Sequence, residues 1–180
     1  MNVAQRIIPV MTILLAAIGL DQLTKILAAI HLAYSPPVSF LNDFIRLQYV
    51  ENSGIMLSLG STLPEWVRFW LFTVFVGVML FILLLYTLFD RSLDRFQVTA
   101  LSLMTAGGIG NIIGRIARNG TVIDFVSIGI GEIRTAIFNV ADMLVFAGVI
   151  MMVLHRRSKG AGEEKLHDHP EQPPSQEKTP

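Results

Sequence analysis

The sequence predicts an all-α membrane protein with four transmembrane helices and a small extracytoplasmic β-structured region. The 180 residues are 52% hydrophobic and only 16% charged, and their mean hydropathy is positive. Four stretches are also mostly apolar over roughly the 20 residues that a helix needs to cross a bilayer. This composition excludes an ordinary soluble domain of similar size.

The four spans are expected at residues 7–32, 69–89, 96–114 and 136–154. The second has no charged residue and is the clearest. The first contains Asp21 and Lys25, but its apolar pattern resumes after Lys25, so we expect a span rather than a cleaved signal peptide. The third ends at Arg115, and the fourth contains Asp142.

Basic residues place both termini in the cytoplasm. They lie before the first span, between the second and third, and after the fourth, at Arg6, Arg91, Arg95, Arg156, Arg157 and Lys159. If the chain crosses four times, all of them fall on one side, and that side is the cytoplasmic one. The longer connections, 33–65 and 116–135, then lie outside. Trp66 and Trp70 would mark the outer interface, where indole rings prefer to sit.

The first outer connection is expected to hold the β-structure. Residues 44–50 alternate between apolar and polar side chains, which predicts a short strand, and residues 51–54 predict a turn. We therefore assign residues 1–157 to one four-helix membrane domain with the outer connection 33–65. Residues 158–180 are rich in Glu, Lys, His and Pro, and we expect them to form a disordered cytoplasmic tail.

Several kinds of chemistry can be set aside. The chain has no cysteine, which excludes disulfides, thiolate metal sites and a cysteine nucleophile. Its formal net charge is zero, so no overall field favours nucleic acid. No zinc-binding pattern such as His-Glu-x-x-His occurs, and we expect no metal and no cofactor.

Two aspartates in short polar sequence segments, Asp124 and Asp142, are the main indication of function. A carboxylate near the apolar part of a bilayer costs several kcal/mol unless it faces a polar interior. Asp124 and Asp142 could meet if the loop between them folds back. Two close carboxylates share a proton, so that one can act as a base toward water while the other donates to a carbonyl oxygen. This is the chemistry of an aspartic peptidase.

Other polar residues in the spans allow a structural or a functional interpretation. Asp21 and Lys25 are four residues apart and therefore lie on one helical face. They could form an ion pair that neutralises both charges, or a polar hub that orients an active site. Asn111 shares a helical face with Arg115, and Asn139 shares one with Asp142. The small residues of the third span, Gly110 and Gly114, would allow another helix to approach closely.

Taken together, these motifs resemble those of the bacterial lipoprotein signal peptidases (signal peptidase II) over about residues 7–155. The matching pieces are Asp21-Gln22-Leu23-Thr24-Lys25, Asn52-x-Gly54, Gly108-x-Gly110-Asn111, Arg115, Gly120-x-Val122-x-Asp124-Phe125 and Phe138-Asn139-x-Ala141-Asp142. The resemblance implies that Asp124 and Asp142 are the catalytic pair. It also implies a set of residues that line or support the site, namely Asp21, Lys25, Asn52, Gly54, Asn111, Arg115 and Asn139.

The resemblance further implies an intramembrane aspartic endopeptidase of the bacterial inner membrane, with its site near the outer face beside a small β-cradle. Such enzymes remove the signal peptide from diacylglyceryl-modified prolipoproteins by cleaving before the lipidated cysteine, and they are the target of globomycin. The expected partners are lipid-modified prolipoproteins and membrane lipid, with no nucleic acid, and we expect a monomer.

The chain departs from the family pattern in three places. Gly114 stands where the family usually has Asp before the arginine, the stretch 115–124 is slightly longer, and residues 54–57 replace a run of small residues and Phe. A non-catalytic or substrate-restricted paralogue that binds lipidated segments is therefore one alternative. A small proton-coupled transporter is another, because intramembrane charges also mark proton relays, although the sequence shows no inverted repeat.

Overall fold

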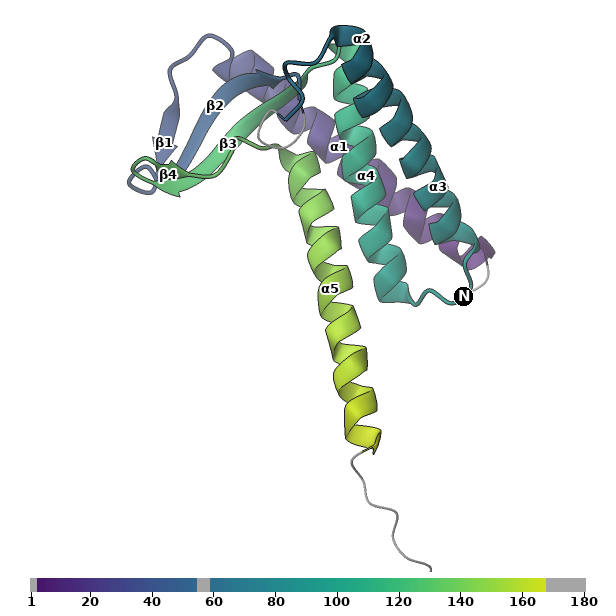
Figure 1. The fold of residues 1–180 in the computed structure, drawn as a ribbon. Coiled ribbons are helices and arrows are strands. Elements are labelled where there is room, and N and C mark those ends of the chain that lie inside the picture. Colours follow the sequence, from purple (N-terminus) through teal and green to yellow (C-terminus); the bar gives the residue numbers. More distant parts are fainter. Residues whose placement is uncertain (1–2, 55–58, 168–180) are drawn as a thin grey trace, which may run out of the picture.

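The computed structural model describes residues 3–54 and 59–167. The helical segments are α1 (Val3–Leu32), α2 (Glu65–Arg68), η2 (Phe69–Phe75), α3 (Val76–Phe89), α4 (Arg95–Ala117) and α5 (Val140–His167). The strands are β1 (Val38–Phe40), β2 (Ile45–Asn52), β3 (Val122–Ile130) and β4 (Ile133–Arg134). Figure 1 shows a helical bundle from one end of which the sheet projects sideways, with the N-terminus near the opposite end.

The bundle is built around α4, which packs against α1, α3 and α5. Apolar residues of α1 and α4 form its main core, including Val10, Leu14, Val98 and Leu101. Glycines let the helices approach closely. A Cβ at Gly107 would lie 2.3 Å from the Ala141 carbonyl oxygen, and one at Gly110 would lie 2.5 Å from a carboxylate oxygen of Asp21. Gly114 is not such a contact, because its nearest neighbours would lie 3.8 Å from an added Cβ.

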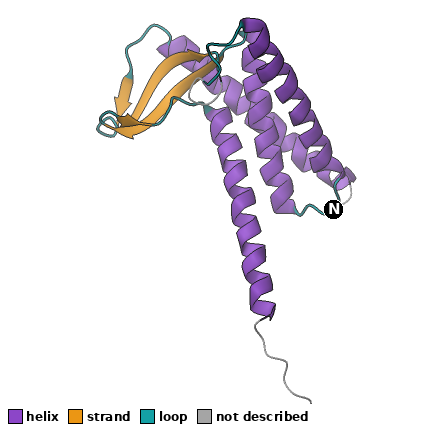
Figure 2. Ribbon diagram, viewed as in Figure 1, coloured by secondary structure: helices purple, strands orange, loops and turns teal. Residues whose placement is uncertain are grey.

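Three helical segments are long and apolar enough to cross a membrane: 3–32, 65–89 and 95–117. The second combines α2, η2 and α3 into one helix that is π-helical over η2 (Figure 2). Large apolar side chains such as Ile8, Leu15 and Phe81 are exposed on these helices, as expected of surfaces that face lipid. Within the described residues, α5 is not among these three segments.

The four strands form one antiparallel sheet in the order β1-β2-β3-β4. Strand β2 confirms the strand predicted for residues 44–50, but it continues through Asn52, so the turn predicted at 51–54 begins later. In the long pair β2–β3, Val50 lies opposite Asp124. Ile123 and Phe125 of β3 pack against Ala28 of α1, which attaches the sheet to the bundle.

The opposite end of the bundle is closed by Arg6. Its guanidinium is buried and donates to the carbonyl oxygen of Thr87, in the last turn of α3, at 3.2 Å. It also donates to those of Asp90 and of Leu93, the latter at 2.9 Å, which follow the end of α3. The backbone of α5 continues as helix to His167, into the segment 158–180 for which we expected disorder. Ala, Glu, Lys and Leu residues of high helix propensity occupy this extension.

Candidate active site

Strand β3 carries Asp124 into the interior between the sheet and the helices. Ile123 and Phe125, on either side of it in sequence, point to α1, so the intervening side chain points the other way. Asp124 is only 4% exposed. One carboxylate oxygen accepts from the side-chain amide of Asn52 at 2.9 Å, and the other accepts from that of Asn139 at 2.6 Å. Each oxygen thus has a hydrogen-bond donor on a different element.

Asn139 and Asp142 form a reciprocal cap at the start of α5. The side-chain oxygen of Asn139 accepts from the backbone N–H of Asp142 at 3.0 Å, and a carboxylate oxygen of Asp142 accepts from the backbone N–H of Asn139 at 3.1 Å. This is the capping-box geometry, which satisfies two otherwise unpaired N–H groups. Asn139 therefore precedes the helix rather than sharing a face of the fourth span with Asp142, as the sequence had suggested.

The start of α5 is tied directly to β3. Val126 and Phe138 exchange backbone hydrogen bonds, each 2.9 Å long, from N–H to carbonyl oxygen. Asn139 follows Phe138, and Asp124 lies two residues before Val126. The chain thus folds back between β3 and α5, as predicted, and brings the segment that holds Asp124 next to the segment that holds Asp142.

A chain of polar side chains supports Asp142 from within the bundle. Its second carboxylate oxygen accepts from the Asn111 amide at 2.8 Å, and the Asn111 oxygen accepts from Lys25 Nζ at 2.9 Å. Lys25 also donates to Asp21 at 2.8 Å, and both side chains are fully buried. The other oxygen of Asp21 accepts from the backbone N–H of Ala141 at 2.9 Å. The pair is therefore both a neutralising ion pair and a hub that positions α5.

Arg115 reaches the site through the loop after β2. It is 8% exposed and donates to the carbonyl oxygen of Gly54 at 2.7 Å, while its guanidinium carbon lies 5.9 Å from the centre of the Phe72 ring. The N–H of Gly54 in turn donates to the Asn52 side chain at 2.9 Å. Arg115 thus holds the segment that presents Asn52 to Asp124. The predicted departure at residues 55–57 lies outside the described residues.

Asp124 lies in an environment that raises its pKa. Burial raises the pKa of Asp124 to about 6, with a smaller contribution from the charge of Asp142, although the hydrogen bonds from Asn52 and Asn139 oppose this shift. A carboxyl group with this pKa can take up or release a proton near neutral pH, as general acid–base chemistry requires. The arrangement therefore suits a pair of carboxyl groups that share a proton.

The structure brings together all the predicted site residues within one connected region, either directly or through Gly54. It adds Gln22, which donates to Asp21 at 2.8 Å and to the carbonyl oxygen of Gly110 at 3.0 Å. Its position beside Asp21 inside an apolar span was the available signal. In the described parts of the chain, no group of three or more His, Asp or Glu side chains is arranged to hold a metal ion.

Comparisons with known proteins identify the family of the chain. A family model described as signal peptidase (SPase) II matches residues 13–156. The lipoprotein signal peptidase of Syntrophus aciditrophicus is 32% identical over 135 residues, which cover 75% of this chain and 83% of the relative. That of Hydrogenovibrio crunogenus is 35% identical over 151 residues, which cover 83% of this chain and 86% of the relative.

Solved structures give the same result for the fold. A bacterial membrane enzyme determined by the in meso method at 1.9 Å resolution has a TM-score of 0.70 at 26% identity, covering 82% of this chain and 91% of that one. Another, at 2.3 Å resolution, has a TM-score of 0.71 at 23% identity, covering 92% and 94%. Because the family model spans most of the sequence and the relatives exceed 30% identity over more than two thirds of it, the chain belongs to the signal peptidase II family.

Proposed function

We propose that this protein is an intramembrane aspartic endopeptidase that removes the signal peptide from diacylglyceryl-modified prolipoproteins by cleaving before the lipidated cysteine. Family membership and the names of the relatives support this reaction. One observation carries it: the side chain of Asn139 contacts both Asp124 and the backbone of Asp142. This link supports the proposed pairing of the two carboxyl groups, which the chemistry of an aspartic peptidase requires.

In the proposed reaction, the ionised member of the pair removes a proton from a water molecule. The water oxygen adds to the scissile carbonyl carbon, and the protonated carboxyl group donates its proton to the carbonyl oxygen. When the tetrahedral intermediate collapses, the C–N bond breaks and the leaving nitrogen takes the proton that came from water. One hydroxyl of the intermediate returns its proton to the other carboxylate, which restores the starting state of the pair. Asn52, Asn111 and Asn139 orient the carboxylates by hydrogen bonds and keep the pair ready for each turnover.

We further propose that α5 is a fourth span, that both termini are cytoplasmic and that the site opens near the outer face. The placement of the basic residues supports this orientation. Reporter fusions at Ser39 and Ser127 should report an outside location, and fusions at Asp94 and Gly160 an inside one. An outside signal at Asp94 would overturn the orientation. We also propose that the protein is a monomer, and light scattering in detergent would test this.

Cleavage of a purified prolipoprotein is the direct test of function. The enzyme should release the signal peptide from a diacylglyceryl-modified substrate and leave the unmodified form of the same precursor uncut. Binding of the lipidated precursor without cleavage would favour a non-catalytic binding protein. Proton flux in liposomes without cleavage would favour a transporter.

A further inference from the structure

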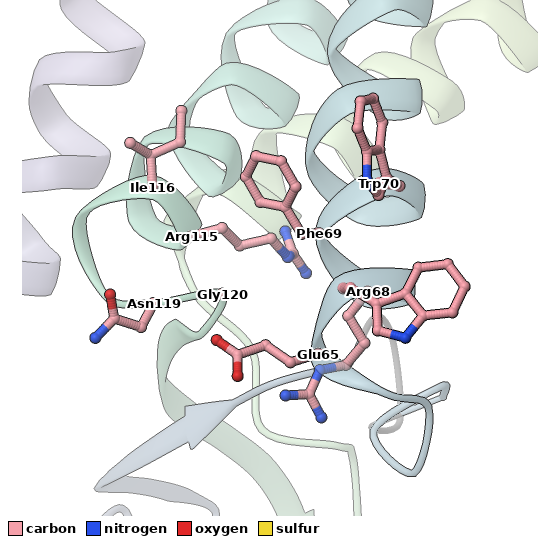
Figure 3. A pocket seen from close by; sticks show the side chains of 9 residues that line it. Glu65, Arg68, Phe69, Trp70, Arg115, Ile116, Asn119 and Gly120 are labelled. Atoms are coloured by element: carbon pink, nitrogen blue, oxygen red, sulfur yellow. The ribbon is translucent and has the colours of Figure 1, made fainter.

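A hollow of about 580 Å³ lies beside the site, between the start of the second apolar helix and the end of α4 (Figure 3). Aromatic residues of α2 and η2 form one wall, and Ile116 with the turn at Gly120 forms the other. Glu65, Arg68 and Arg115 also line this hollow. None of the mechanistic steps above uses it.

Two arginines at this hollow have unused hydrogen-bonding capacity. Arg68 donates to the Ser61 carbonyl oxygen at 2.8 Å and Arg115 donates to Gly54, yet the buried Nε of each has no partner among the described residues. Buried donors are almost always satisfied, so these two unpaired donors indicate an acceptor that lies outside the described residues. Only 8% of the Arg115 surface is exposed.

The third charged residue that lines the hollow, Glu65, is negatively charged. Glu65 is exposed, and within residues 3–54 and 59–167 its carboxylate forms no hydrogen bond or ion pair. In Figure 3 the Glu65 carboxylate points toward the turn at Gly120, between the Arg115 guanidinium on one side and the Arg68 guanidinium, which lies below it, on the other. The hollow thus offers donors for an anionic group and an acceptor for a cationic one.

The position of the hollow indicates a membrane ligand. It opens at the start of the apolar segment 65–89, and Trp66 and Trp70 beside it are 69% and 60% exposed. Indole rings prefer the membrane–water interface, where lipid headgroups lie. Phe69 and Trp70 belong to the π-helical segment η2. Such segments are rare and frequently occur at functional sites.

We propose that this hollow binds the headgroup of a phospholipid that carries a phosphodiester and a primary ammonium, as in phosphatidylethanolamine. The phosphate accepts hydrogen bonds from Arg68 and Arg115, and the ammonium donates to Glu65. Phosphatidylglycerol offers no cation to Glu65, and the quaternary ammonium of phosphatidylcholine has no N–H to donate. The inference goes beyond the proposed function, because the diacylglyceryl group of the proposed substrate carries no phosphate.

Native mass spectrometry of the full chain, released from detergent with equal amounts of the three lipids, tests this proposal. Phosphatidylethanolamine should bind in preference to the other two. Glu65→Gln should weaken its binding roughly tenfold, the effect of losing one charge-assisted contact, and should remove its preference over phosphatidylglycerol. The matched control is Glu132→Gln, an exposed glutamate in the turn between β3 and β4, which should change nothing.

Soluble headgroups separate headgroup chemistry from acyl-chain contacts. Glycerophosphoethanolamine should compete with the lipid, and glycerophosphoglycerol should not. If neither competes, or if Glu65→Gln binds all three lipids as the wild type does, the assignment is wrong. Displacement of the lipid by a peptide from the mature part of a lipoprotein would assign the hollow to the substrate instead. The measurement needs no turnover, so its outcome is independent of whether the protein cleaves prolipoproteins.

Discussion

The side-chain amide of Asn139 lies 2.6 Å from a carboxylate oxygen of Asp124 and donates a hydrogen bond to it. The oxygen of the same amide accepts the backbone N–H of Asp142. One side chain therefore sets the position of one aspartate relative to the helix that carries the other. The geometry of the proposed catalytic pair depends on this residue as much as on the aspartates themselves.

Asp124→Asn and Asp142→Asn should each abolish cleavage of a diacylated prolipoprotein, by roughly 10²–10⁴-fold or more, because each removes a proton donor or acceptor. The double variant should be little worse than either single variant, since the two residues act as one unit. Rates are measured by gel shift of the purified precursor. Asp90→Asn, in the turn between α3 and α4, is the control and should retain wild-type rates. Near-normal turnover in either site variant would show that the assignment of the pair is wrong.

Two substitutions at Asn139 should separate its capping role from its contact with Asp124. Asn139→Ala removes both and should lower the free energy of unfolding by about 1 kcal/mol or more. Asn139→Ser keeps a good capping residue but is too short to reach Asp124, so it should retain stability and still lose most activity. Thermal unfolding in detergent and cleavage rates give the two readouts. Equal activity of Asn139→Ser and wild type would remove Asn139 from the catalytic arrangement.

The pKa of Asp124 predicts a specific pH dependence of stability. Burial raises this pKa from 3.8 to about 6, so between these values the folded state binds more protons than the unfolded state. The contribution to stability is therefore complete below about pH 4 and is lost as the pH rises through about 6. Its upper limit is roughly 3 kcal/mol. Relative to Asp124→Asn, the wild-type Tm should fall across this window, and parallel profiles of the two proteins would contradict the assignment.

Much of this fold could be predicted from the sequence because lipid imposes long apolar runs. The spans found at 3–32, 65–89 and 95–117 were predicted to within a few residues, apart from the earlier starts of the first two. Strand β3 was not predicted. Its residues Val122 and Ile123 are both buried, so the alternation that identifies a half-exposed strand is missing. Its partners β2 and α1 are also distant in the sequence, and no local pattern identifies them.

The site was predicted as a set of residues but not as an arrangement. An Asn three residues before an Asp can mark a helix N-terminus, and this pattern at Asn139 was interpreted as one helical face instead. The bond from Asn52 to Asp124 spans 72 residues of sequence and depends on the register of β2 with β3. Only the tertiary structure could show it.

The buried pair Asp21–Lys25 should be costly to break. Lys25→Met leaves the Asp21 carboxylate buried without its cation and should destabilise the protein by about 3–5 kcal/mol. The double variant Asp21→Asn/Lys25→Met should be more stable than Lys25→Met alone, because it leaves no unpaired charge. Arg46→Met, which breaks the partly exposed pair with Asp43, is the control and should cost no more than about 1 kcal/mol. Equal losses at the two pairs would show that burial does not set the cost.

The glycines of α4 should respond in opposite ways to a side chain. Gly110→Ala should disrupt the bundle, since its Cβ would lie 2.5 Å from Asp21, whereas Gly114→Ala should be tolerated with its nearest neighbours at 3.8 Å. There is thus room for a Cβ at the position where the resemblance to the family implies Asp. Because the described structure gives buried Arg115 no carboxylate within ion-pair distance, we expect Gly114→Asp to raise stability or turnover through a charge-assisted hydrogen bond, worth about 1.5–3 kcal/mol gross.

Thermal unfolding and cleavage rates for Gly114→Ala and Gly114→Asp decide between charge and size at this position. A gain in Gly114→Asp with no change in Gly114→Ala means that charge beside Arg115 limits the wild-type protein. Unfolding of Gly114→Asp with tolerance of Gly114→Ala means that the position accepts a methyl group but nothing larger. Unchanged activity and stability in both would show that Arg115 needs no anionic neighbour. Its bond to Gly54, which holds the segment carrying Asn52, would then be sufficient to position it.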